Sequence, residues 1–527
     1  MLAKFETAFF GSESLSVFAE TTMLIQLLKC SALSFLVFAS TFSCSDNPVR
    51  SDKIASSNFY YQPNVNRMAA EWEPAVGTMI VWPLCIPYKL AVELAKDSHI
   101  YTLVENEQSK IEALKWYTEW GIDSNRNTFI YLPLGVDSWW VRDWGPPAVF
   151  TPDGTMKLGD GRYVFSTPIS KIQCGDSLEF LNASGDHQII NTQTDDRATD
   201  FLSKSLNIDL LDLPFINTGG NVLTDGLGTA FSTCILVNEN RFFGVSKEKF
   251  FRLNKELLGI ERYNILSNFE KWGMQHIDCY MKLLDEERIL VMEPPKDHEL
   301  FQVYEDIIEN EIKKLKNPYG RPYEIFRIKT ERYDEDRLAA YTNSLIVNKT
   351  IYVPLFNIKE DSVALSTWRQ VMPGYAIKGF GFKLSDEPVI SQKMRDNYQQ
   401  YGWRFADALH CRVRAIWDAQ MLFMTSNRIE AKVDRKNDNT VYVTIIDYSK
   451  KGLQMEDIAL LWRVQGEEKW NSTALNQVKN SNHFYTRIPF HTPGATVQYY
   501  LSAVSKSGRK ETLPKTAPAG YYQFSIQ

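Results

Sequence analysis

The sequence lacks the features that mark several common classes of protein. It has no low-complexity tract, no heptad repeat and no apolar run of the roughly 20 residues that a helix needs to cross a bilayer. Its 58 Lys and Arg residues form no cluster, and the net charge is −6. A nucleic-acid partner is therefore not expected. Aromatic residues are plentiful, and the 13 Trp among them suit a well-walled pocket or a large core.

Cysteine is scarce, and its spacing excludes a zinc ribbon or a thioredoxin-like site. No CxxC pair occurs among the seven cysteines, which stand at positions 30, 44, 85, 174, 234, 279 and 411. Two of them fall in the N-terminal segment, so an odd number remains and at least one thiol is expected to be free. No acidic run has the spacing of a calcium loop. We expect neither a metal nor another cofactor, and one cysteine is a candidate nucleophile.

The N-terminal segment is similar to a bacterial export signal. Starting at Met23, a lysine precedes a short apolar run, and small residues then lead to Cys44. This order is typical of a secretory signal, and it also resembles a lipoprotein signal in which Cys44 is lipidated. We expect residues 1–44 to export the protein, either to the bacterial cell envelope or surface or as a secreted protein, with Met23 as the real start. Contact with a membrane is expected only through a lipid on Cys44; a buried N-terminal helix is the alternative.

The rest of the chain divides into three parts by composition and hydrophobic pattern. Residues 45–65 are polar and predict a tether. Residues 66–427 alternate short apolar runs such as TMIVWPL with helical stretches such as KLAVELAKDS, which indicates an α/β domain. Residues 428–527 contain short alternating strands between Asn, Gly, Lys and Pro turns, a pattern typical of an immunoglobulin-like β-sandwich.

Four stretches of the α/β region carry residues suited to chemistry: WWVRDWGP (139–146), TGGNVLTDGLGT (218–229), MQHIDCYMKLL (274–284) and DALHCRVRAI (407–416). In the first, Asp143 is surrounded by tryptophans, so either Arg142 pairs with it or it receives a cation from outside the chain. In the second, Gly219 and Gly220 have neither GxGxxG spacing nor a Walker lysine. These glycines predict a close backbone approach or a tight turn rather than a phosphate loop.

The third stretch places a histidine and a carboxylate two residues apart. If the stretch is a strand, His276 and Asp278 share one face. They would suit a proton shuttle beside a charge-binding carboxylate, although a bland core pair and two metal ligands are alternatives.

The fourth stretch contains a cysteine followed by two arginines. We expect Arg412 and Arg414 to lower the pKa of the Cys411 thiol from its ordinary value of about 8.5. Strand alternation would send His410 to the opposite face, so the two residues are not paired in this prediction. Taken alone, Cys411 is better explained as a small core residue, because a cysteine in an apolar strand is more often that than a nucleophile.

A thiol, a His-x-Asp pair and a tryptophan-walled aspartate suit one substrate type, a planar guanidinium. This cation keeps its charge and offers paired N–H donors to carboxylates. Each carboxylate at 4 Å contributes about 4 kcal/mol at an effective dielectric constant of about 20. A tryptophan wall adds cation–π attraction. A thiolate can attack the central carbon while an imidazolium protonates the departing ammonia.

The motifs WVRDWGP, TGGN…DG, HID, YTNSLIVN and LHC, in this order, resemble the bacterial peptidylarginine deiminase and agmatine deiminase family of guanidine-modifying enzymes. The resemblance implies a five-bladed pseudosymmetric α/β propeller and a covalent S-alkylthiouronium intermediate. It also implies a role for each residue: Cys411 as nucleophile, His276 as general acid and then base, Asp143 and Asp278 as the guanidinium clamp, and Trp140, Asn343, Gly219 and Gly220 as substrate-binding positions.

The substrate is predicted from the same motifs. Thr218 stands where agmatine deiminases carry Glu, so the form here is closer to the secreted peptidylarginine deiminases. Peptide or protein arginine, converted to citrulline, is the first prediction, and agmatine, converted to N-carbamoylputrescine, is the alternative. Arg162 and Lys171 offer no close arginine pair for a peptide carboxylate. A Cys–His amidase and a surface lipoprotein that only binds ligands are the hypotheses from other classes.

Overall fold

The computed structural model describes residues 61, 63–136, 138–163, 165–166, 189–190, 193–270, 275–398, 400–403, 406–433, 439–489 and 491–527. The predicted targeting segment with Cys44, and most of the predicted tether, lie outside these residues. The chain from Ser57 onwards forms one compact unit. Within the described residues, none of the helices has the length and apolar character needed to span a membrane.

Two small sheets of the α/β part stand alone, β7 (Phe165–Ser166) with β8 (Ile189–Ile190) and β16 (Arg332–Asp334) with β17 (Arg337–Leu338). The other five sheets of the α/β part, among the described residues, repeat one pattern of pairing. In each, an antiparallel pair of strands is followed by a parallel neighbour. The sheets are β21 (Arg414–Trp417), β2 (Ala75–Val81), β3 (His99–Val104) and β4 (Asn127–Tyr131); β1 (Arg67–Met68), β5 (Ala148–Phe150), β6 (Met156–Arg162) and β9 (Leu210–Ile216); β10 (Leu223–Thr224), β11 (Thr229–Thr233) and β12 (Arg262–Leu266); β13 (Met281–Leu283), β14 (Arg288–Glu293) and β15 (Glu324–Lys329); and β18 (Leu345–Val347), β19 (Thr350–Leu355) and β20 (Ala376–Gly381).

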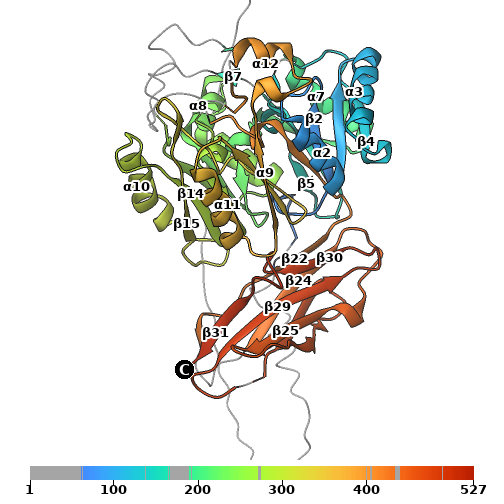
Figure 1. The fold of residues 1–527 in the computed structure, drawn as a ribbon. Helices are drawn as coiled ribbons and strands as arrows, with labels where there is room; N and C mark the ends of the chain where they lie inside the picture. The colour runs from blue at the N-terminus through green and yellow to red at the C-terminus, as the bar shows by residue number, and fades with distance from the viewer. Residues whose placement is uncertain are drawn as a thin grey trace, which may run out of the picture. The chain divides into compact units, whose positions relative to one another are not determined.

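Helices join the parallel strands, because a parallel pair needs a crossover of a dozen or more residues. These connections contain α2 (Tyr88–Asp97), α3 (Glu107–Glu119), α7 (Ala198–Leu206), α8 (Cys234–Phe242), α9 (Lys247–Leu258), α10 (Phe301–Asn310) and α11 (Glu360–Val371). In Figure 1, α3 and α10 lie at opposite outer edges of the α/β part. Helix α9 begins at Ser246, whose side chain accepts a hydrogen bond from the Lys249 amide, and ends at Gly259 with a φ of 70°.

The ring of sheets closes late in the chain. Strand β21 pairs antiparallel with β2, so a segment after residue 410 completes the sheet that begins near the N-terminal end of the described residues. Five sheets of one pattern, closed in this way, agree with the α/β propeller expected from the sequence.

In each of these sheets, the strand that pairs antiparallel with the central strand is preceded by a short turn, and these five turns carry the sequence motifs. They are α4 (Val141–Trp144) before β5, η2 (Gly219–Asn221) before β10, η3 (Ile277–Cys279) before β13, residues 341–344 before β18, and η6 (His410–Arg412) before β21. Equivalent positions in a pseudosymmetric ring meet at its centre. The repeat was not visible in the sequence, because the five turns share no residue pattern.

Two of these turns were predicted wrongly as strands. Ile277–Cys279 forms the 3₁₀ turn η3 directly after His276, and the strand β13 begins only at Met281. The His410 to Arg412 segment is likewise a 3₁₀ turn, and β21 begins at Arg414. Turn geometry therefore replaces the alternation of faces that was expected of both segments.

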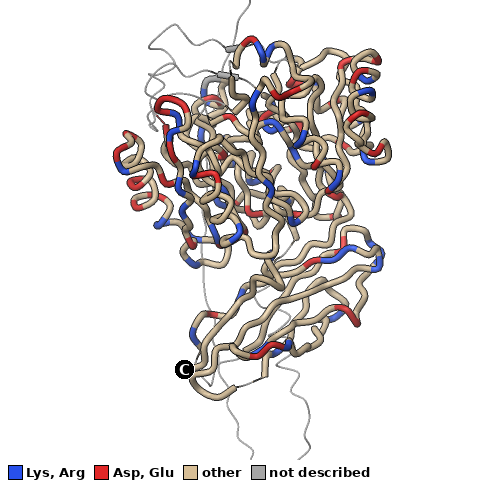
Figure 2. The backbone as a smooth tube through the Cα atoms, in the orientation of Figure 1, with Lys and Arg blue, Asp and Glu red and all other residues tan. Residues whose placement is uncertain are grey.

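The C-terminal part of the chain is all-β. One sheet contains β22 (Leu422–Ser426), β24 (Thr440–Asp447), β28 (His483–Arg487) and β27 (Asn476–Gln477), and the other contains β23 (Lys432–Val433), β31 (Tyr522–Ile526), β29 (Thr496–Val504), β25 (Ala459–Val464), β26 (Asn471–Ala474) and β30 (Lys510–Leu513). Val443, Phe484, Leu460 and Leu501 pack in the core they share. The immunoglobulin-like assignment and the boundary at 427/428 stay predictions. Figure 2 shows basic and acidic residues interspersed along the backbone.

Candidate active site

Gly220 marks the point where the predicted functional side chains meet. A Cβ at this position would lie 2.3 Å from Asp143 Oδ1, 3.2 Å from His276 Nδ1 and 3.3 Å from Asp278 Oδ2. At Gly219 a Cβ would lie 2.2 Å from the Arg142 carbonyl oxygen. Both glycines therefore permit close approach of other parts of the chain: side chains of three predicted site residues at Gly220, and the Arg142 backbone at Gly219. The predicted approach to a ligand stays a prediction.

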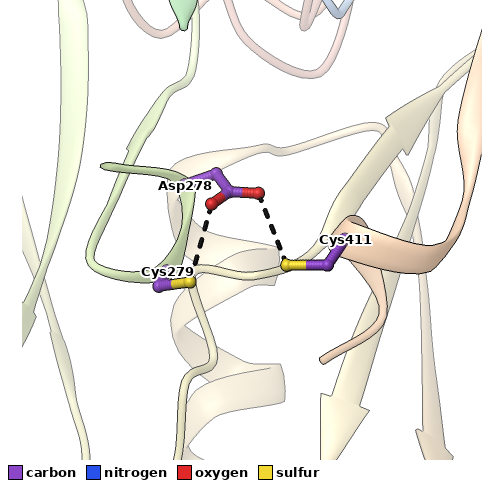
Figure 3. A group of neighbouring side chains, drawn as sticks. All are labelled: Asp278, Cys279 and Cys411. Atoms are coloured by element: carbon purple, nitrogen blue, oxygen red, sulfur yellow. Dashed lines mark hydrogen bonds between the residues drawn. The ribbon is translucent and has the colours of Figure 1, made fainter. Parts of the chain in front are cut away.

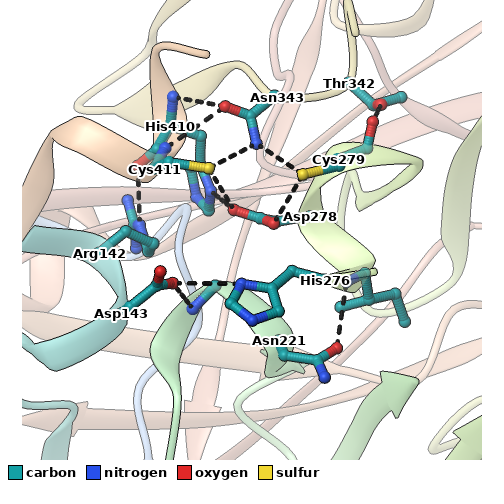
Figure 4. Close-up of polar contacts among 12 residues, drawn as sticks. Arg142, Asp143, Asn221, His276, Asp278, Cys279, Thr342, Asn343, His410 and Cys411 are labelled. Carbon is teal, nitrogen blue, oxygen red and sulfur yellow. Dashed lines mark hydrogen bonds and ion pairs between the residues drawn. The ribbon is translucent and has the colours of Figure 1, made fainter. Parts of the chain in front are cut away.

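Asp143 is fully buried and does not pair with the arginine before it (Figure 4). Arg142 donates instead to the carbonyl oxygens of His410 and Val413, at 3.3 and 3.1 Å. The Oδ1 atom of Asp143 accepts a hydrogen bond of 3.0 Å from the Gly220 amide. Its Oδ2 atom is buried and has no hydrogen-bond partner among the described residues. One carboxylate oxygen thus remains open to a donor from outside the chain.

His276 forms an ion pair with the same carboxylate. Its Nδ1 atom lies 3.4 Å from Asp143 Oδ1. Burial alone would lower the pKa of His276, but the negative charges of Asp143 and then Asp278 outweigh burial and raise that pKa to about 9. Burial raises the pKa of Asp143, and the His276 charge counters only part of this effect. His276 is therefore an imidazolium at neutral pH.

Asp278 is the centre of a second charged network. Its Oδ2 atom lies 2.6 Å from His410 Nδ1, and the Nε2 atom of the same ring lies 3.1 Å from Glu71 Oε1. Glu71 Oε2 accepts in turn from Lys282 Nζ at 3.0 Å. Burial would raise the pKa of both carboxyl groups, but His410 lowers the pKa of Asp278, and His410 with Lys282 lowers that of Glu71. Both carboxylates stay ionised.

Cys411 lies against this network. Its Sγ atom accepts a hydrogen bond of 3.2 Å from Asn343 Nδ2 and lies 3.8 Å from Asp278 Oδ2. Asn343 also uses its Oδ1 atom to accept from the amides of His410 and Cys411, at 3.0 and 3.3 Å. The amide side chain therefore fixes both the turn and the sulfur.

Two predictions about Cys411 are wrong. Burial, followed by the charges of nearby carboxylates such as Asp278, raises the pKa of its thiol to about 12. Arg412 cannot offset this effect because it pairs with Asp407 at 2.8 Å, and Arg414 donates to the carbonyl oxygen of Arg142 at 2.6 Å. His410 was expected on the opposite face, yet both it and Cys411 contact Asp278.

Three residues of the site were missed by sequence reasoning: Glu71, His410 and Asn221. The Asn221 Oδ1 atom accepts from the amides of Thr233 and Ile277, at 3.0 and 3.1 Å, and so ties η3 to β11. Its place in the TGGN motif was the available signal. Glu71 lies far from the other motifs in the sequence, and no pattern around it pointed to the site.

The remaining predicted positions divide between the site and the surface. Trp140 is half-buried directly before α4, with its ring 5.3 Å from that of Trp139. Arg162, considered as a partner for a peptide carboxylate, is exposed, and its guanidinium lies 4.4 Å from the Phe243 ring centroid. Lys171 lies outside the described residues.

A closed ring of α/β sheets with a thiol, an imidazolium and two carboxylates at its centre has the features of a guanidine-modifying enzyme. A family model described as Porphyromonas-type peptidyl-arginine deiminase matches residues 67–383, which is more than half of the 527-residue chain. The chain belongs to that family, whose reaction is the deimination of a guanidine. The matched range ends before Cys411, so the position of the thiol comes from the geometry above.

The proteins similar to this chain carry two kinds of name. A protein of Mycoplasma capricolum named "Putative agmatine deiminase" is 26% identical over 347 residues, which cover 59% of this chain and 89% of the relative. Among solved structures, the agmatine deiminase of Enterococcus faecalis matches with a TM-score of 0.51 at 16% identity, over 69% of this chain and 99% of its own. The "Putative Arginine Deiminase" of Porphyromonas gingivalis matches with a TM-score of 0.50 at 19% identity, over 67% and 99%. At these identities the two structures show a shared fold.

Proposed function

We propose that the protein hydrolyses the guanidinium group of peptide- or protein-bound arginine to citrulline and ammonia, with Cys411 as the nucleophile. The convergence of Asp143, His276 and Asp278 around Gly220 carries this proposal, because a side chain of any size there would fill the space between them. Two buried carboxylates are suited to a cation with paired donors. The open Oδ2 atom of Asp143 offers one such acceptor.

The first half of the reaction makes a covalent intermediate. A thiol with a pKa of about 12 is protonated at neutral pH, so the substrate's own positive charge must stabilise the thiolate, and the thiol proton is released to solvent before attack. The thiolate of Cys411 then bonds to the guanidinium carbon. The His276 imidazolium gives its proton to the departing nitrogen, which leaves as ammonia. The product of this half is a thiouronium on Cys411 and a neutral His276.

The second half releases the product. Neutral His276 takes one proton from water as the oxygen attacks the thiouronium carbon. The C–S bond breaks, Cys411 returns to the thiolate, and the second proton of the water passes to the ammonia to give ammonium. Glu71 and His410 take no proton in these steps; they hold the Asp278 carboxylate ionised and in place.

The choice of peptide arginine over agmatine rests on sequence features. The Thr218 form of the glycine motif resembles the secreted peptidylarginine deiminases, and the family model carries the same description. Agmatine remains the second candidate because the M. capricolum and E. faecalis relatives bear that name. The surroundings of Arg162 give no support to a preference for C-terminal arginine.

We also propose that the protein is exported and attached to a membrane through a lipid on Cys44. The signal-like segment after Met23 supports this, and so does Cys234, which is disulfide-bonded, since structural disulfides persist in oxidising compartments. Cell fractionation with a Cys44→Ala variant tests the anchor. Release of that variant from the membrane fraction is expected, and an unchanged membrane fraction would rule out the lipid.

A ureido-group assay on the protein without residues 1–44 tests the activity. The substrates are agmatine, free arginine, a peptide ending in arginine and a peptide with internal arginine. Product from the peptides that disappears in Cys411→Ala is the expected result. Product from agmatine alone would show that the protein is a deiminase of small guanidines and not of peptides. Asp143→Asn separates a deiminase from a Cys–His amidase, because only the deiminase needs that charge.

A further inference from the structure

A second thiol lies beside the candidate nucleophile, and the proposed reaction gives it no role. Cys279 follows Asp278 directly and is a free, buried cysteine. Its Sγ atom lies 3.5 Å from Asp278 Oδ1, and Cys411 Sγ lies 3.8 Å from Asp278 Oδ2 (Figure 3). Each of the three residues offers one ligand atom, and these atoms all lie within 4.8 Å of one another.

We propose that Asp278, Cys279 and Cys411 form a binding site for a thiophilic divalent cation, with Zn²⁺ as its representative, and that this ion inhibits the enzyme. The sulfur and oxygen ligands of a tetrahedral zinc ion lie about 3.5 Å apart, given Zn–S bonds of about 2.3 Å and Zn–O bonds of about 2.0 Å. The distance of 3.5 Å between Cys279 Sγ and Asp278 Oδ1 matches that spacing. Cys411 Sγ lies 3.8 Å from the other oxygen of the same carboxylate, and the three ligand atoms lie within 4.8 Å of one another, so a small shift would bring all three to a bound ion. Such an ion would inhibit the enzyme and would take no part in catalysis. It is therefore not a cofactor, and the sequence analysis expects none.

The groups around the three ligands are those that a metal site requires. Asn343 Nδ2 donates to both sulfurs, at 3.2 Å to Cys411 and 3.6 Å to Cys279. His410 Nδ1 lies 2.6 Å from the Asp278 carboxylate. Such outer contacts orient metal ligands, and their loss typically weakens metal affinity 10- to 100-fold. With three protein ligands, the fourth position of the tetrahedron stays open to water.

Two sulfur ligands decide which ions the site takes. Thiolates favour zinc and other soft ions, whereas Mg²⁺ and Ca²⁺ require oxygen ligands. A bound ion would occupy the sulfur that attacks the substrate and the carboxylate that faces the guanidinium. The metal and the substrate would therefore exclude one another. This competition rests on the proposed function, but the binding of the ion does not.

Metal binding is measured on the full protein with Co²⁺, whose charge-transfer absorption reports each thiolate bound to it, and by calorimetry with Zn²⁺. Cys279→Ser removes one ligand, and Cys85→Ser is the matched control because Cys85 is a free, buried cysteine outside the cluster. The wild type and Cys85→Ser are expected to bind one ion per chain with a strong band. Cys279→Ser should show a weaker band and a Kd at least about tenfold higher. Equal binding by Cys279→Ser, or none by the wild type, would overturn the proposal.

Alkylation gives a second measurement that needs no variant. Zn²⁺ should protect Cys279 and Cys411, but not Cys85, from a thiol reagent in the wild-type protein, as read by peptide mass spectrometry. Unprotected Cys279 would contradict the site.

Activity assays then separate the two proposals. Zn²⁺ should inhibit competitively with the guanidine substrate, chelation should restore activity, and Cys279→Ser should need at least about tenfold more Zn²⁺ relative to its own uninhibited rate. A protein that binds Zn²⁺ without deiminase activity would overturn only the proposed function. An active enzyme that binds no Zn²⁺ would overturn only the metal site.

Discussion

Replacing Gly220 by alanine tests the geometry on which the functional proposal depends. The new Cβ would lie 2.3 Å from Asp143 Oδ1, far inside van der Waals contact, and 3.2 Å from His276 Nδ1. The Gly220 backbone has no positive φ, so alanine is compatible with it and the collision is the main effect. The carboxylate of Asp143 must move, and the hydrogen bond of 3.0 Å from the Gly220 amide is disturbed.

The size of the effect follows from the charge that is displaced. A carboxylate at 4 Å from a guanidinium contributes about 4 kcal/mol at an effective dielectric constant of about 20. Loss of that interaction lowers kcat/KM about 1,000-fold, since about 1.4 kcal/mol corresponds to a factor of ten. We expect the melting temperature to change far less than the activity, because the collision is confined to one side chain.

The assay is kcat/KM for the best substrate of the ureido-group panel, with a thermal melt of each variant. Gly381→Ala is the matched control, because a Cβ there would meet only the Leu355 carbonyl oxygen, at 4.0 Å, and the residue also lacks a positive φ. It should keep wild-type activity. A Gly220→Ala enzyme within about threefold of wild type, a change worth only about 0.6 kcal/mol, would refute the argument that substrate, carboxylates and imidazole share this space.

Three further predictions follow from the buried charges. The kcat profile, which reports the complex in which bound substrate keeps Cys411 ionised, should fall as pH rises through about 9, because His276 must be protonated to act as an acid; a flat kcat profile from pH 7 to 10 would contradict its role. Glu71→Gln should lower the free energy of unfolding by about 3 kcal/mol in a denaturant titration, because it leaves Lys282 buried without its carboxylate; an unchanged midpoint would contradict the network. Burial raises the pKa of Glu286 from 4.5 to about 8. Its stabilising effect is therefore full below pH 4.5 and lost as pH rises through about 8, so Glu286→Gln should melt higher than wild type at pH 9 and equally at pH 4.5; equal melting at pH 9 would contradict this sign.

Much of the fold could be predicted from the sequence, because strands and helices of the α/β part differ clearly in period. TMIVWPL overlaps β2, and KLAVELAKDS overlaps α2. The wrong secondary-structure predictions were those for the motif segments. Cys411 lies in a 3₁₀ turn and His276 lies directly before one, and burial and tertiary hydrogen bonds such as that from Asn343 to Cys411 override the strand pattern there.

Residues of the site could be predicted where a chemically suitable side chain lies within a recognisable motif, as Asp143 and Cys411 do. The pKa shifts of these residues could not be predicted, because a charged residue that is adjacent in the sequence need not be adjacent in space. Arg412 follows Cys411 in the chain but forms its ion pair with Asp407. Glu71 lies far away in sequence and yet contacts His410.

The most direct test of the central claim is the mass of the protein quenched with acid during turnover of an arginine peptide. The account predicts an adduct equal to the substrate minus ammonia, on the peptide that contains Cys411, and no adduct in Cys411→Ala. Ureido product formed without an adduct, or an adduct on another residue, would contradict it.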